Sequence, residues 1–98
     1  MARTMKLYFW QSIHPDPAGG RRLDTRDACY APSKKRVLEV SGNLGQPSAL
    51  FNLRVVVDIE AELAHDPSLA EIVAAPETVF WQRSIVYGPD HSWNRVTR

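Results

Sequence analysis

The sequence of 98 residues predicts a small α+β domain, and three observations support this fold class. Two segments, 5–13 and 78–87, are rich in aromatic and β-branched residues, as strands are. Two others, 33–42 and 67–75, have start and stop signals of helices. A chain of this length builds one hydrophobic core, so we expect a single domain over 1–98. Its antiparallel sheet includes both strands, and both helices pack on one face of that sheet.

The first predicted strand, 5–13 (MKLYFWQSI), carries consecutive aromatic residues. Because successive side chains of a strand point to opposite faces, Tyr8 and Trp10 share one side and Phe9 lies on the other. The strand predicted at 78–87 contains the same FWQ run. We therefore expect aromatic groups on both faces of the sheet. One face packs on the helices, and the other is covered either by this chain or by a partner.

Segment 14–27 contains two prolines and a Gly-Gly pair, which predict a long loop. The helix at 33–42 follows a proline, which suits a first helical turn, and ends at a glycine. In the helix at 67–75, Ser68 and Glu71 have the spacing of a capping box.

Segment 49–63 fits two structures. Every odd position in it is apolar, a period of two that indicates a half-buried strand. Its end, IEAELA, consists of strong helix formers. The pattern favours a strand near 52–58 followed by a helix from about residue 59.

The net charge of +1 hides an asymmetry between the two halves of the chain. Residues 1–54 carry nine Lys or Arg and four Asp or Glu, whereas residues 55–98 carry three and seven. Such an asymmetry can steer a charged partner, although charges of the two halves can also pair with each other and with water. The densest basic residues are Arg21, Arg22, Lys34, Lys35 and Arg36, and the densest acidic ones are Asp58, Glu60 and Glu62.

Few residue patterns in the sequence indicate catalysis or metal binding. The single cysteine, Cys29, excludes an internal disulfide and a cysteine-based zinc site, and its neighbours suggest a buried small apolar residue. The three histidines lack the i, i+4 spacing of a helical zinc-binding pair. Without a convergent set of titratable groups, we expect no enzyme activity, no metal and no cofactor. No apolar run approaches a membrane span, and no signal-peptide core is present, so we expect a cytoplasmic protein.

Three short motifs, the Ser33 to Gly42 helix, LFNL at 50–53 and PETVFW at 76–81, carry a family resemblance. Over roughly 31–93, the chain resembles uncharacterised short bacterial proteins of phages, plasmids and integrated mobile elements. The segment RVVVDIEAELAHD departs from the pattern of that group. The group has no agreed activity, so the resemblance implies no catalytic residue. It implies an accessory protein of mobile DNA, and by analogy one that binds host machinery.

The leading functional hypothesis is a small non-enzymatic binding protein of a mobile element. It engages a host protein complex and, in the stronger form of the hypothesis, inhibits it, as an anti-CRISPR-type inhibitor does. Tryptophan and tyrosine are frequent in binding hot spots, and a spaced row of carboxylates can imitate nucleic-acid phosphates. The predicted contacts are Tyr8, Trp10, Trp81, Asp58, Glu60 and Glu62.

The alternative is a nucleic-acid-binding accessory protein with a helix-turn-helix-like segment at 33–54. Basic residues at its first helix could contact phosphates. The near-neutral charge and the acidic residues that follow this segment argue against it. The residues that would bind nucleic acid are Arg21, Arg22, Lys34, Lys35 and Arg36.

Overall fold

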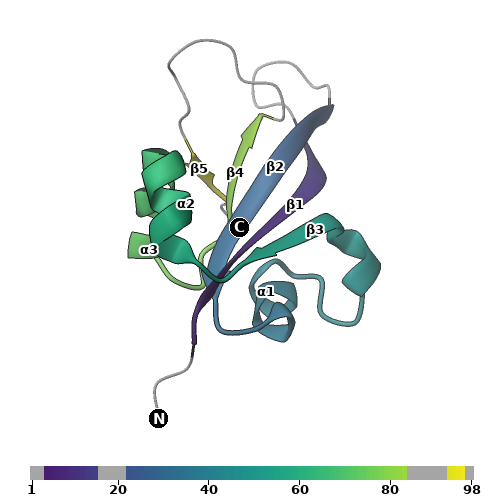
Figure 1. Cartoon of the computed structure of the whole chain (residues 1–98). Helices are drawn as coiled ribbons and strands as arrows, with labels where there is room; N and C mark the ends of the chain where they lie inside the picture. The colour runs from purple at the N-terminus through teal and green to yellow at the C-terminus, as the bar shows by residue number, and fades with distance from the viewer. Residues whose placement is uncertain (1–3, 16–21, 84–92, 97–98) are drawn as a thin grey trace.

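A five-stranded antiparallel sheet with strand order β3-β1-β2-β4-β5 forms the centre of the computed structural model, which describes residues 4–15, 22–83 and 93–96 (Figure 1). The predicted α+β class is confirmed. The strands are β1 (Lys6–Pro15), β2 (Arg22–Ala31), β3 (Phe51–Val56), β4 (Phe80–Arg83) and β5 (Asn94–Arg95).

Both predicted helices are present. The helix predicted at 33–42 is α1 (Lys34–Val40), and the one predicted at 67–75 consists of a 3₁₀ turn, η2 (Pro67–Leu69), and α3 (Ala70–Ala74). The ambiguous segment resolves as the pattern favoured, with β3 followed by α2 (Ile59–His65). A further 3₁₀ turn, η1 (Pro47–Ala49), leads into β3.

The predicted loop at 14–27 is wrong for most of its length. The strand β1 continues to Pro15 and pairs with β2 in one unbroken antiparallel register, while residues 16–21 lie outside the described part of the chain. The prolines and glycines that predicted the loop all precede β2, and within that strand Asp27 is buried and accepts a 2.6 Å hydrogen bond from the hydroxyl of Thr25. A polar side chain with such a partner can be buried in a sheet at little cost.

The two strands with FWQ runs belong to the same sheet, as predicted, but they are not neighbours. The central strand β2 lies between β1 and β4 and pairs with both. Of the strand predicted at 78–87, the structure describes β4, and the segment 84–87 lies outside the described residues.

The helices cover both faces of the sheet, so the prediction that α1 and α3 share one face is wrong (Figure 1). The alternation along β1 sends side chains into two separate cores, each with its own helical cover. One core, which packs against α2 and α3, contains Leu7, Phe9, Ala28, Val56, Leu69, Ile72, Phe80 and Trp93. The other, which packs against α1, contains Tyr8, Trp10, Cys29, Ala31, Val37, Leu38, Leu50 and Val79. The chain itself therefore covers the second aromatic face.

Candidate functional site

The aromatic contacts predicted on β1 are core residues. Tyr8 and Trp10 are each only 3% exposed, beneath α1. At this exposure neither side chain offers a partner a contact surface, so their place in the predicted binding site is wrong. Trp81 on β4 is half-buried.

The acidic residues lie on α2 and its cap rather than along a strand. Asp58 caps α2 by accepting a 3.1 Å hydrogen bond from the backbone N–H of Ala61. Glu60 is exposed in the first turn, and Glu62 forms an ion pair with Arg54 at 2.8 Å. The predicted extended row of carboxylates is therefore wrong, but Asp58 and Glu60 remain accessible beside the end of β3.

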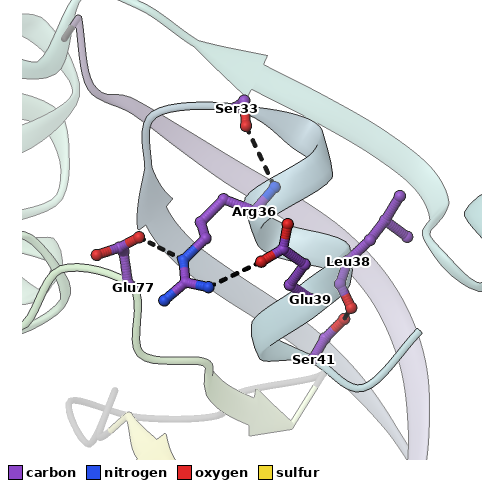
Figure 2. A network of polar contacts seen from close by, with 6 residues as sticks. All are labelled: Ser33, Arg36, Leu38, Glu39, Ser41 and Glu77. Atoms are coloured by element: carbon purple, nitrogen blue, oxygen red, sulfur yellow. Dashed lines mark hydrogen bonds and ion pairs between the residues drawn. The ribbon is translucent and has the colours of Figure 1, made fainter. Parts of the chain in front are cut away.

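Arg36, predicted to contact nucleic acid, belongs to an intramolecular network on α1 (Figure 2). Its guanidinium donates to Glu39 at 2.9 Å and to Glu77, and these hydrogen bonds, that to Glu77 above all, raise its pKa. The N-cap of α1 is Ser33, whose hydroxyl accepts a 3.2 Å hydrogen bond from the Arg36 backbone N–H. Because Glu77 precedes β4, the network fixes α1 against the chain that enters that strand.

The helix-turn-helix-like segment is contradicted by the structure. The helix α1 is present, but the segment that would form the recognition helix is the strand β3. Lys34 and Lys35 are exposed on α1. Arg21 lies outside the described residues, as does the side chain of Arg22.

The outer flank of β3 exposes large apolar side chains. Phe51, Val55 and Val57 are 64%, 46% and 67% exposed, respectively, whereas Val56 is buried. The period of two correctly predicted a strand, but the expectation that its apolar odd positions are buried is wrong at 51, 55 and 57. Within the described sheet β3 is an edge strand, paired with β1. We call the set Phe51, Val55, Val57, Asp58 and Glu60 the β3 flank.

A bulge shapes the start of this strand. Asn52 adopts a left-handed conformation with φ of 51°, and the register with β1 shifts between Phe9 and Gln11. The side-chain amide of Asn52 donates to Gln11 Oε1 at 2.7 Å and holds the bulge to β1. Bulges bend an edge strand and redirect its side chains.

Comparisons with protein-family models, with curated proteins and with solved structures found no match. Over residues 4–15, 22–83 and 93–96, no helix is both long and apolar enough to span a bilayer. The same residues contain no cluster of three or more His, Cys, Asp or Glu side chains suited to a metal ion.

Two arginines converge on the face of the sheet beside α2. The guanidiniums of Arg26 on β2 and Arg54 on β3 lie 4.6 Å and 5.8 Å from the centre of the Phe9 ring. That of Arg26 also lies 5.6 Å from the ring of Trp93. Burial lowers the pKa of Arg26; Arg54 lowers it further, whereas Asp66 and Glu62 oppose the shift.

These arginines line a cleft of about 660 Å³, which we call the arginine cleft. Its walls are Arg26, Arg54, Glu62, His65, Asp66 and Pro67. A smaller hollow of about 220 Å³ shares both arginines and reaches Gln11 and Asn52. No local pattern in the sequence indicates this site, because Arg26 and Arg54 come together only through the pairing of β1 with both β2 and β3.

Cys29 is fully buried in the α1-side core, as its neighbours suggested. Burial raises the pKa of its thiol to about 12, with a smaller contribution from Glu77. The thiol is therefore protonated near neutral pH and is a poor nucleophile. Burial also raises the pKa of the Tyr8 hydroxyl, and Cys29 adds a smaller effect in the same direction.

Proposed function

We propose that this protein is a non-enzymatic binding protein that engages a protein partner through the β3 flank. The observation that supports this proposal most directly is the exposure of Phe51 and Val55 on an edge strand and of Val57 directly after it. An edge strand offers backbone donors and acceptors to a further strand, and exposed apolar side chains beside it can fill pockets on a partner. Both features suit addition of an extended partner segment to the sheet.

The acidic end of the β3 flank indicates the charge of the partner. Asp58 and Glu60 are exposed directly after Val57, at the start of α2. Basic residues on a partner would complement these carboxylates and would speed association. The preferred partner therefore presents an extended apolar segment flanked by Lys or Arg.

In its narrower form, we propose that the partner is a host protein complex in the cytoplasm and that this chain is a protein of a mobile element. A CRISPR effector is one example, and inhibition is its expected consequence. The family resemblance over 31–93 supports this form. A basic nucleic-acid groove on such a complex would suit the acidic end of the β3 flank.

A pull-down from bacterial lysate with the full chain tests the proposal. A double variant, Phe51→Ala with Val57→Ala, should lose the captured complex, whereas Leu44→Ala should retain it. Leu44 is the matched control because it is also a large exposed apolar residue, 59% exposed, but lies outside the flank. Equal capture by all three proteins would contradict the role of the flank.

Nucleic-acid binding by Lys34 and Lys35 predicts a different result. The isolated protein would then shift duplex DNA at physiological salt, with affinity falling steeply as salt rises. Loss of that shift in a Lys34→Gln, Lys35→Gln variant, without a change in protein capture, would favour this alternative.

A further inference from the structure

The arginine cleft offers cations that the fold leaves incompletely paired. A guanidinium has five N–H donors. Among the described residues, the Arg26 guanidinium lies over the rings of Phe9 and Trp93. The Arg54 guanidinium donates one hydrogen bond, to Glu62. Within the part of the chain that the structure describes, these contacts leave donors of both groups for a ligand.

The two cations lie close together, and the carboxylates of Asp66 and Glu62 offset part of their mutual repulsion. Both guanidiniums lie over the single ring of Phe9, and Arg54 is close enough to lower the pKa of Arg26. An oxyanion beside both guanidiniums would accept charge-assisted hydrogen bonds from them and would lessen the remaining repulsion. The planar guanidinium fork suits phosphate and carboxylate oxygens.

The wall of the cleft is held in place by its own contacts. Ser68 donates from its hydroxyl to Asp66 at 2.6 Å and accepts a 3.2 Å hydrogen bond from the Trp93 indole N–H. The ring that flanks Arg26 and the carboxylate of Asp66 thus belong to one network. Such preorganisation lowers the entropy cost of binding.

The remaining lining residues suggest the rest of the ligand. Glu62 and Asp66 offer acceptor oxygens within the same cleft as the two arginines. A hydroxyl or amino group on the ligand could donate to them while its oxyanion contacts the guanidiniums. The volume of about 660 Å³ falls in the range of small-molecule sites.

We propose that the arginine cleft binds a small organic anion, with its phosphate or carboxylate between Arg26 and Arg54 and its hydroxyl or amino groups toward Glu62 and Asp66. This proposal is independent of the β3 flank, because the two sets of residues do not overlap. Each can fail without the other.

Titration of the full-length protein, followed by NMR through the arginine Nε–H and backbone amide signals, tests the inference. The probes are ribose 5-phosphate, malate and uncharged ribose. We expect saturable shifts at Arg26 and Arg54 with one or both anions and none with ribose. The anion that binds more tightly assigns the oxyanion as phosphate or carboxylate. Shifts that stay linear up to high concentration for both anions would overturn the proposal.

Variants separate a defined site from general charge attraction. Arg54→Gln should weaken binding of the anion by about tenfold, as expected for loss of a charge-assisted contact. Lys6→Gln removes the same charge at the start of β1, outside the cleft, and should leave the affinity unchanged. Equal weakening by both variants would overturn the site.

A third variant should change the affinity for the anion in the opposite direction. Glu62→Gln removes the charge that competes for Arg54 but keeps an acceptor oxygen for a ligand hydroxyl, so it should tighten binding of the anion several-fold. Because damage to the fold would weaken binding instead, this variant distinguishes competition for Arg54 from structural disruption. Unchanged or weaker binding by a folded Glu62→Gln protein would count against the proposal.

Discussion

The indole of Trp93 donates a hydrogen bond to the hydroxyl of Ser68, with 3.2 Å between Nε1 and Oγ. This contact joins the chain just before β5 to the turn η2. The Ser68 hydroxyl in turn donates a hydrogen bond to the Asp66 carboxylate. Ser68→Ala leaves the nearly buried indole N–H without this partner, so we expect a loss of about 1–3 kcal/mol in the free energy of unfolding. Urea denaturation measures it. Ser48→Ala, at an exposed serine of η1, is the control and should change little.

The burial of Trp10 and the exposure of Phe51 predict opposite effects of substitution. Trp10→Ala should destabilise the protein by about 3–5 kcal/mol, because it empties part of the core beneath α1. Phe51→Ala should change stability by less than about 0.5 kcal/mol while weakening partner binding. Thermal unfolding and pull-down, run on both variants, check this separation. A stably folded Trp10→Ala protein that no longer captured the partner would instead show that Trp10 belongs to the binding site.

The left-handed backbone at Asn52 predicts a ranking of substitutions. Asn52→Gly should be close to neutral, since glycine adopts positive φ without penalty and the lost side-chain bond to Gln11 is exposed. Asn52→Val should cost about 1–2 kcal/mol, because a β-branched side chain clashes in this conformation. Denaturant midpoints give the order. Equal stability of the two variants would show that the bulge is absent in solution.

The buried thiol of Cys29 predicts a loss of stability at alkaline pH. Its pKa is raised from an ordinary value near 9 to about 12, so the folded state keeps a proton that the unfolded state releases. Stability is therefore unaffected below pH 9 and falls between pH 9 and 12, by at most about 1.4 kcal/mol per pH unit. Tyr8, whose pKa is raised from 10.0, adds to the fall above pH 10.

Denaturant titrations at pH 7, 9, 10 and about 11 measure this slope. In Cys29→Ala the fall between pH 9 and 10 should disappear, whereas the fall above pH 10 that is due to Tyr8 should remain. The same slope in wild type and variant would mean that a group other than Cys29 causes the fall in stability.

Local patterns in the sequence predict much of this fold. The change from alternating apolar residues to helix formers marks where β3 ends and α2 begins, and both signals lie within a few residues of each other. The strand β2 escapes such reasoning because its polar residues resemble a loop. Asp27 becomes acceptable inside a sheet only when Thr25 supplies its hydrogen bond and neighbouring strands cover both.

The candidate sites depend on pairing between distant segments, which no local pattern encodes. The alternation along β1 predicts aromatic side chains on both faces of the sheet, but only the position of α1 shows that Tyr8 and Trp10 are covered. Arg26 and Arg54 meet because β1 lies between their strands and places Phe9 beneath both guanidiniums. Charge counts detect these arginines as basic residues without indicating that they share a cleft.

Because consecutive residues of β1 enter different cores, the two layers of the protein share one backbone segment. Detaching either layer disturbs the strand on which the other depends. Sub-global openings that release one helix with its half of the core are therefore disfavoured, and the main-chain amides of β1 should exchange with solvent deuterium only through complete unfolding. The domain should behave as one cooperative unit, although its hydrophobic residues are divided between two sides of a sheet.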